Sequence, residues 1–176
     1  MKATRKATVI GAFAGPAEEA GIQPGSDKRV VRPDPLRFGR ILVPTDFSDP
    51  SKQALKYAAR FVEQFGSKVT LIHVMEPTMS PDFTHFPLAL DDEKVTEEAK
   101  RRLRHLGKIY INERYLDPVV VVSGSPFHEI SETAQEMKAD LIIIATHGYT
   151  GIKRALLGST AERVVRHAQC TVMTVR

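Results

Sequence analysis

A glycine-containing loop near the C-terminus has the residue types of an anion-binding site. Ala145-Thr146-His147-Gly148 follows the apolar residues 141–144, and after nine further residues Gly158-Ser159 precedes the helical pattern 160–167. Unpaired backbone N–H groups and the positive end of the helix dipole meet at such a junction. We therefore expect a phosphate group to bind there.

The residues of this loop also have simpler structural explanations. Gly148 and Gly158 could let a phosphate approach closely, or serve only as turn and packing glycines. Ser159 and Glu162 have the spacing of a capping box, which predicts that Ser159 caps the helix. Both roles can coexist, since the backbone N–H groups of Ser159 and Thr160 can still point at a ligand.

A carboxylate follows the first apolar run of the regular part of the chain. Pro44-Thr45-Asp46 comes directly after residues 40–43, so Asp46 could accept hydrogen bonds from ribose hydroxyls or a base amine. The alternative is an Asx-turn that starts the following helix. Position alone favours neither role.

Few residues indicate catalysis. His73 and His147 flank the expected cleft, but His73 lies in an apolar run, where a hydrogen-bonded structural histidine is the more common case. The six His and the single Cys show no metal-ligand spacing. The sequence contains no G-x-S-x-G and no G-x-x-x-x-G-K-S/T motif. We assign no catalytic residue.

Strand and helix patterns alternate from residue 40 onward. Apolar runs predict strands at 40–44, 68–75, 118–122, 141–145 and 171–175. Between them, helical spacing predicts helices from the N-cap Ser48 to Gly66, from 92 to about 113, over 126–137 and over 159–167. This alternation predicts a single-domain, doubly wound, five-stranded parallel sheet with helices on both faces. A flavodoxin-like or related nucleotide-binding sheet is the simplest such fold, with its ligand beyond the carboxyl ends of the strands.

Composition and charge bound the remaining possibilities. Residues 1–39 hold seven Lys or Arg against four Asp or Glu, while the rest of the chain is nearly balanced at 18 against 17. The regular part therefore lacks the basic excess of a nucleic-acid-binding domain. No run reaches the roughly 20 apolar residues of a membrane span, and one cysteine forms no disulfide framework, so we expect a cytoplasmic protein. Frequent Gly and Pro indicate that 1–38 is a flexible or partner-binding extension before a domain at 39–176.

Two segments indicate partners. The long connection 76–91 contains three Pro and two Phe, which is typical of a lid or a partner-binding loop. The last apolar run, Thr171–Val175, ends the chain and would lie at an edge of the sheet. Because apolar edge strands invite pairing, we expect a homodimer through this strand.

These motifs together resemble the universal stress protein family over residues 38–176. The resemblance rests on the sequence at 41–48, on Leu-Ile-His-Val at 71–74, on the loop from 145 to 159 running into 161–165, and on residues 167–172. It implies an α/β sheet in the order 3-2-1-4-5, of the nucleotide-binding α-hydrolase-like type, and a dimer through the last strand.

The ATP-binding members of the family carry G-x-x-G, nine residues, and then Gly followed by Ser or Thr. Ala145 departs from the first glycine, and a positive φ would cost more for alanine than for glycine. The resemblance implies ATP, with Mg²⁺ or Mn²⁺ bridging its phosphates, adenosine near the loop after the first strand, and Val74 acting through its backbone. The implied contact residues are Pro44, Thr45, Asp46, Val74, Ala145, Thr146, His147, Gly148, Tyr149, Thr150, Gly151, Gly158, Ser159, Thr160 and Ala161.

The resulting prediction is a nucleotide-dependent regulator in the stress response. A slow ATPase is one alternative, although no residue clearly supplies a nucleophile or positions a water. An interaction module without nucleotide is another, for which Ala145 and the unmatched extension are the motivating features. We expect Gly158→Val to remove ATP binding with the fold intact, by filling the place of a phosphate, and Asp46→Ala to weaken binding by about 1–3 kcal/mol.

Overall fold

The computed structural model describes residues 37–76, 92–147 and 157–176, which include every predicted strand and helix. The strands are β1 Arg40–Pro44, β2 Lys68–Met75, β3 Val120–Ser123, β4 Leu141–Ala145 and β5 Thr171–Val175. The helices are α1 Asp49–Phe65, α2 Asp92–Tyr110, α3 Pro126–Glu136 and α4 Ser159–His167, with a short 3₁₀ helix at Glu113–Tyr115. Residues 1–36 of the predicted extension and 77–91 of the predicted lid lie outside the described residues.

The five strands form one parallel sheet in the order β3-β2-β1-β4-β5. The predicted doubly wound fold is confirmed, with the strand order that the family resemblance implies. The order differs from that of flavodoxin, in which the first strand lies between the second and the third. Here β1 lies between β2 and β4 at the centre of the sheet, and β5 lies at one edge.

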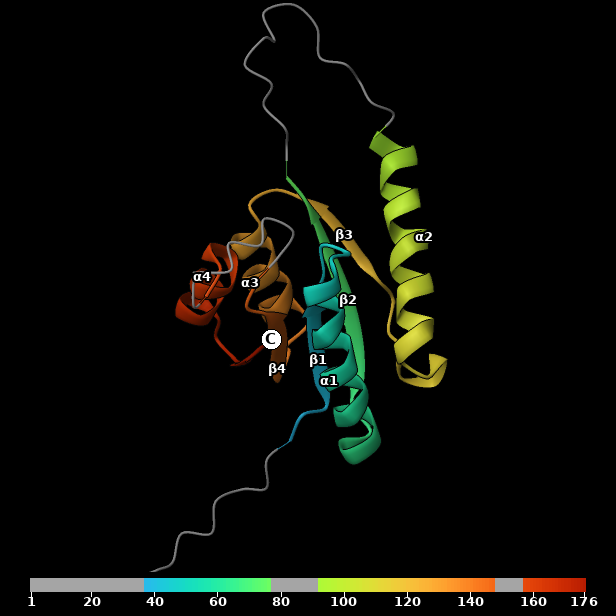
Figure 1. Cartoon of the computed structure of the whole chain (residues 1–176), viewed down its shortest axis with the longest axis vertical. Coiled ribbons are helices and arrows are strands. Elements are labelled where there is room, and N and C mark those ends of the chain that lie inside the picture. The colour runs from blue at the N-terminus through green and yellow to red at the C-terminus, as the bar shows by residue number, and fades with distance from the viewer. Residues whose placement is uncertain (1–36, 77–91, 148–156) are drawn as a thin grey trace, which may run out of the picture. The chain divides into compact units, whose positions relative to one another are not determined.

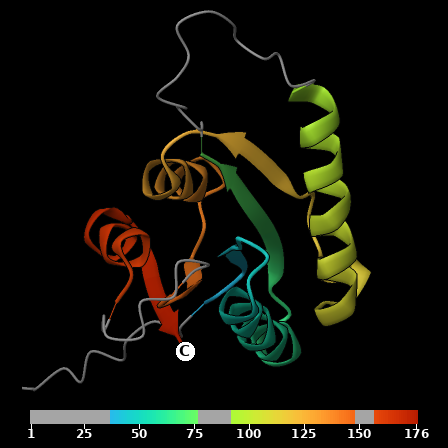
Figure 2. The same ribbon diagram turned by 45° about the horizontal axis from the view of Figure 1, so that its top comes forward.

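Helices cover both faces of this sheet (Figure 1 and Figure 2). On one face α1 and α2 pack on the strands through a core that includes Leu55, Leu71 and Leu103, each fully buried. On the other face α3 and α4 pack through a second core that includes Ile142 and Val164. The strands supply both cores because successive side chains of a strand point to opposite faces. None of the helices described is long and apolar enough to cross a membrane.

The ends of α1 are where the sequence predicts them. Ser48 is the N-cap, and its side chain accepts a hydrogen bond from the backbone N–H of Ser51 at 3.3 Å. Pro50 lies in the first turn, where no N–H is needed. Gly66 ends the helix in the left-handed conformation, with φ of 66°, which glycine adopts without strain.

The predicted bounds of the second helix, the third strand and the third helix are wrong by one to about three residues. The second helix ends at Tyr110 rather than near 113, because Asn112 caps the separate 3₁₀ helix by accepting a hydrogen bond from Arg114 N–H. It continues through Gly107, where a Cβ atom would lie 2.7 Å from the Leu116 side chain, so the missing side chain makes room for packing. The third strand begins at Val120 rather than 118, since Pro118 has no N–H to donate to the sheet, and it ends at Ser123 rather than 122. The third helix ends at Glu136 rather than 137.

Candidate functional site

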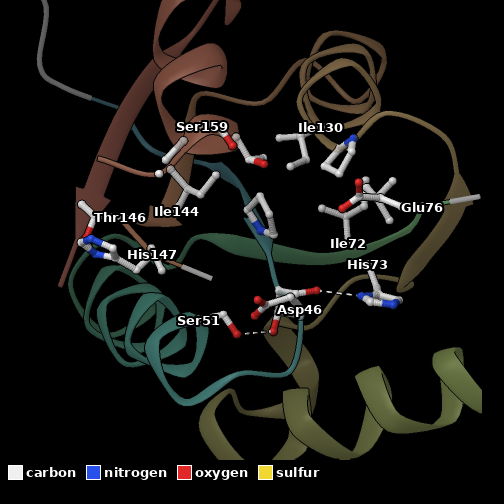
Figure 3. Close-up of a pocket in the computed structure, with 18 residues that line it drawn as sticks. Asp46, Ser51, Ile72, His73, Glu76, Ile130, Ile144, Thr146, His147 and Ser159 are labelled. Carbon is white, nitrogen blue, oxygen red and sulfur yellow. Dashed lines mark hydrogen bonds between the residues drawn. The ribbon is translucent and has the colours of Figure 1, made fainter. Parts of the chain in front are cut away.

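A pocket of about 260 Å³ lies at the carboxyl ends of the central strands (Figure 3). Its walls come from the ends of β1, β2 and β4 and from the amino-terminal parts of α1, α3 and α4. The chain leaves β1 toward α1 on one face of the sheet and leaves β4 toward α4 on the other face. A crevice at such a switch point is the usual ligand site of an open α/β sheet.

All eleven described residues of the predicted contact set line this pocket. They are Pro44, Thr45, Asp46, Val74, Ala145, Thr146, His147, Gly158, Ser159, Thr160 and Ala161. The other four predicted residues, Gly148, Tyr149, Thr150 and Gly151, lie outside the described residues. Segments about 100 residues apart in the sequence therefore meet around one cavity.

Side-chain hydrogen bonds shape the loop between β1 and α1. The hydroxyl oxygen of Thr45 lies 2.8 Å from that of Ser51 and accepts a hydrogen bond from the N–H of Phe47 at 3.0 Å. Oδ1 of Asp46 accepts hydrogen bonds from the N–H of Ser48 at 3.0 Å and from its hydroxyl at 2.5 Å. The predicted Asx-turn is therefore present, and the same carboxylate also lines the pocket.

His73 holds this loop from the neighbouring strand. Its Nδ1 lies 2.9 Å from the carbonyl oxygen of Thr45, and because that oxygen can only accept, Nδ1 carries the hydrogen. The predicted structural role of this histidine is confirmed. His73 also borders the pocket, as expected from its place in the sequence.

Near the end of β2, backbone N–H and C=O groups beside the pocket have no β1 residue opposite them. The β1–β2 register ends with Pro44 opposite Ile72, and the N–H of Thr45 donates to the carbonyl oxygen of Ile72 at 2.9 Å. In a parallel strand the N–H and C=O of every second residue face the same neighbour. The N–H and C=O of Val74 thus face the place where β1 would continue, beside the pocket, and no β1 residue lies opposite them.

The opposite wall of the pocket is the start of α4. The N–H of Gly158 donates to the carbonyl oxygen of Thr146 at 2.6 Å, which brings the helix start against the end of β4. Gly158 is the N-cap, so the predicted capping box is wrong: Ser159 is already the first helical residue and makes no capping hydrogen bond. Its side chain is exposed on the pocket side instead.

Ala145 fits its position without strain. It is the last residue of β4 and is buried. Among the residues that the structure describes, Phe47 and Lys138 are the non-glycine residues with positive φ, so Ala145 has an ordinary backbone conformation. The conformational cost expected for alanine in place of the first motif glycine is therefore absent.

Charge is unevenly distributed around the pocket. Asp46 and Glu76 lie on the β1–β2 side, while Ser159 and the amino end of α4 lie on the β4 side (Figure 3). The first N–H groups of a helix have no partner within the helix, and the helix dipole is positive there. The pocket thus has an acidic end that attracts hydrogen-bond donors and an N–H-rich end that attracts anions.

Sequence reasoning missed six residues of the pocket wall: Ser51, Ile72, Glu76, Pro126, Ile130 and Ile144. Two of them, Ile72 and Ile144, point from the strands toward the face covered by α3 and α4. Alternation along β2 could have identified Ile72 once Val74 was placed on that wall. Pro126 and Ile130 come from α3, and only the strand order reveals that α3 starts beside the pocket.

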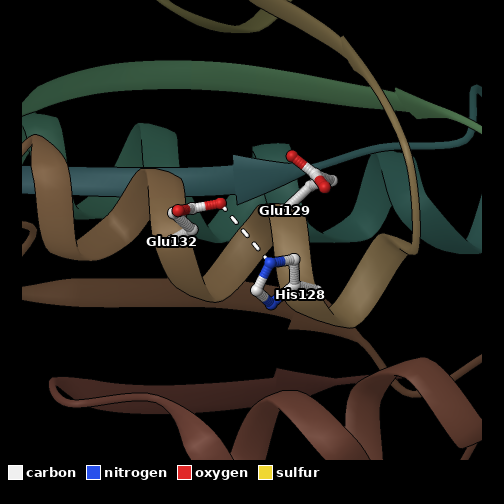
Figure 4. A group of neighbouring side chains, drawn as sticks. All are labelled: His128, Glu129 and Glu132. Carbon is white, nitrogen blue, oxygen red and sulfur yellow. Dashed lines mark ion pairs between the residues drawn. The ribbon is translucent and has the colours of Figure 1, made fainter.

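A second group of polar side chains lies on the exposed side of α3 (Figure 4). Ligand atoms of His128, Glu129 and Glu132 lie within 4.8 Å of one another. His128 and Glu132 are one turn apart, with Nε2 and Oε2 at 3.6 Å, and their side chains are 63% and 55% exposed. This arrangement is that of a surface i, i+4 pair on a helix.

Comparisons with known proteins agree on one family. The sequence profile of the Universal stress protein family matches residues 37–176. The chain is 35% identical over 151 residues to universal stress protein MJ0531 of Methanocaldococcus jannaschii, covering 84% of this chain and 87% of that protein.

Solved structures share the fold. The structure of MJ0577 from the same organism, 32% identical, superposes with a TM-score of 0.66 and covers 78% of this chain and 95% of that one. A universal stress protein from Archaeoglobus fulgidus, solved in complex with dAMP, superposes with a TM-score of 0.55 over 80% of this chain and 99% of its own, at 19% identity.

Proposed function

This chain belongs to the universal stress protein family, and we propose that it binds an adenine nucleotide, ATP, in the pocket at the carboxyl ends of β1, β2 and β4. The observation that carries the proposal is the convergence of all eleven described candidate residues on that one pocket. The dAMP complex of the Archaeoglobus fulgidus protein supports it, since that protein with the same fold holds an adenine nucleotide. Binding would make the protein a nucleotide-dependent regulator in the stress response.

The polarity of the pocket favours one orientation of the nucleotide. The phosphates belong at the amino end of α4, where Ser159 and Thr160 offer backbone N–H groups and hydroxyls. The adenosine belongs at the acidic end, where Asp46 can accept hydrogen bonds from ribose hydroxyls. The unmatched N–H and C=O of Val74 form a donor–acceptor pair that complements N1 and the amino group of adenine.

Mg²⁺ or Mn²⁺ fits this arrangement as a partner of the phosphates. The described residues at the α4 end of the pocket offer N–H and hydroxyl groups, whereas the carboxylates Asp46 and Glu76 lie at the other end. A cation would therefore be held chiefly by phosphate oxygens and water, as Mg²⁺ commonly is. Its contribution would be to neutralise phosphate charge.

The first experiment is to denature the purified protein and identify any released nucleotide by chromatography and mass spectrometry. Titration calorimetry of the nucleotide-free protein then measures the affinities for ATP with Mg²⁺, for adenosine and for GTP. We expect ATP to be released from the denatured protein or to bind in the titration. Adenosine should bind more weakly than ATP because it lacks the phosphate contacts. A folded protein that releases no nucleotide and gives no heat would instead favour the interaction module.

We also propose a homodimer through β5. This strand is an edge of the sheet, and Val175 faces β4 because its carbonyl oxygen accepts the N–H of Thr146 at 2.8 Å. By alternation, the backbone groups of Val172 and Thr174 face the open edge. A two-fold pairing of β5 with its copy would satisfy these groups and join two sheets.

Thr174→Pro is expected to convert the dimer to a monomer with little loss of fold. Proline removes an N–H that faces the open edge and not β4, and sheet edges are where proline is tolerated. Sedimentation velocity over a hundredfold concentration range measures the change. A wild-type protein that sediments as a monomer at every concentration would contradict the dimer, as would a Thr174→Pro protein that stays dimeric.

A further inference from the structure

We propose that Arg102 of α2 is a positioning residue for the nucleotide, acting through Phe47 on the loop that carries Asp46. The proposal rests on the proposed nucleotide-binding function. Within the described residues, α2 supplies no part of the pocket wall. Its influence on the pocket would come from one contact chain, which runs from Arg102 through Phe47 to His73.

The contacts that link Arg102, Phe47 and His73 are short. The guanidinium carbon of Arg102 lies 4.1 Å from the ring centroid of Phe47, a cation–π distance. The Phe47 ring in turn lies 4.6 Å from the His73 ring, centroid to centroid. His73 donates to the carbonyl oxygen of Thr45, the residue before Asp46. These contacts thus connect Arg102 to the pocket wall.

The backbone of Phe47 explains why the loop needs such support. Its φ is 66°, in the left-handed region that bulky side chains rarely adopt. A residue held there stores strain, which persists only when surrounding contacts outweigh it. Core packing and the hydrogen bond of the Phe47 N–H support it, and the contacts with Arg102 and His73 add to that support. Loss of either contact would let the loop populate other conformations more often. Nucleotide affinity then falls in proportion to the fraction of molecules with the binding-competent loop.

Arg102 differs in this respect from its neighbour. Arg101 makes two hydrogen bonds to Glu98 on its own helix, at 2.8 and 2.7 Å, and both side chains are more than half exposed. Replacing Arg101 removes the same charge from the same helix but leaves the Phe47 contact in place. Arg101→Ala is therefore the matched control for Arg102→Ala.

Two amide hydrogens report the loop without any nucleotide. The N–H of Phe47 donates to Oγ1 of Thr45, and the N–H of Ser48 donates to Oδ1 of Asp46. Hydrogen exchange of these amides, followed by NMR, measures how often the loop opens. Calorimetry with adenosine, which carries no charge, measures binding without long-range attraction between Arg102 and phosphates.

We expect Arg102→Ala to weaken adenosine binding about two- to five-fold and to speed exchange of both amides by a similar factor, the range that an exposed cation–π contact supplies. Arg101→Ala should change neither, and Arg102→Lys should keep most of both, since an ammonium can also bind the ring. In the Asp46→Ala background, Arg102→Ala should have no further effect on affinity, because the loop then has no carboxylate to position.

Several results would overturn the proposal. Equal effects of Arg101→Ala and Arg102→Ala would mean that Arg102 acts only through its positive charge and not through its contact with Phe47. Faster exchange with unchanged affinity would make Arg102 a structural residue only. If the wild-type protein bound neither adenosine nor ATP, the nucleotide function and the positioning role would both fall, while amide exchange would still decide whether Arg102 holds the loop.

Discussion

Gly158→Val is expected to lower the affinity for ATP by about a hundredfold or more while adenosine still binds. A Cβ atom at position 158 would lie 2.9 Å from the backbone carbonyl oxygen of Thr146, closer than packed atoms allow. The carbonyl belongs to the backbone and cannot swing aside, so the start of α4 must move away from β4. Loss of two hydrogen bonds to phosphate, each worth about 1.5–3 kcal/mol for a charged acceptor, gives the expected factor.

The physical reason differs from the one that the sequence suggests. The added side chain would not occupy the place of a phosphate: it would point at Thr146 and separate the two walls of the pocket. The substitution should therefore also lower the stability of the fold. We expect a loss of about 1–3 kcal/mol in the free energy of unfolding, as for other overpacked sites. Urea unfolding measures this loss, and calorimetry measures both ligands.

Gly39→Ala is the matched control for this variant. A Cβ atom at position 39 would lie 3.4 Å from a carboxylate oxygen of Asp140, an ordinary contact. The residue lies at the amino end of β1, away from the pocket. We expect normal affinity for both ligands. Full ATP affinity in Gly158→Val, or equal loss of adenosine binding, would contradict a phosphate site at the start of α4.

The strands could be predicted because the central ones are buried on both faces. β4 and β1 are continuous apolar runs, and the predicted bounds of β1, β2, β4 and β5 match the structure. Strand order could not be predicted from the β/α alternation, because the alternation is the same in a flavodoxin-like sheet and in this one. Only the family motifs distinguished the two orders.

The errors in the candidate site have local causes. Ser159 and Glu162 fit the capping-box spacing, but the hydrogen bond from Gly158 to Thr146 fixes the chain so that Gly158 is the N-cap. Sequence spacing cannot reveal that contact, which joins two walls of the pocket. The left-handed conformation of Phe47 was equally hidden, since a bulky aromatic residue gives no sign of positive φ.

Asp46→Ala is expected to weaken ATP binding by about 1–3 kcal/mol, which corresponds to roughly 5- to 150-fold. The carboxylate accepts two hydrogen bonds from Ser48 and also lines the pocket. A carboxylate can accept several hydrogen bonds at once, so the turn and a ribose hydroxyl can share it. Part of the loss would come from the ligand contact and part from a loosened loop.

Two further variants separate these parts. Asp46→Asn keeps an oxygen that can accept hydrogen bonds from Ser48 but removes the charge. It should retain the turn and lose only the part of the binding free energy that depends on the negative charge. Asp49→Ala, the control, removes an exposed carboxylate that pairs with Lys52 at 2.7 Å outside the pocket, and should bind ATP normally. Calorimetry with ATP and 2′-deoxyATP then locates the contact on the ligand.

If Asp46 holds the ribose, the wild-type protein should prefer ATP to 2′-deoxyATP and Asp46→Ala should bind both equally. A contact with the base amine would instead give the same loss for both nucleotides in Asp46→Ala. Unchanged affinity for both would mean that this carboxylate serves only the turn before α1. Because Asp46→Ala also removes the acceptor of the Ser48 N–H, that result would further show that the loop keeps its shape through Thr45, Phe47 and His73 alone.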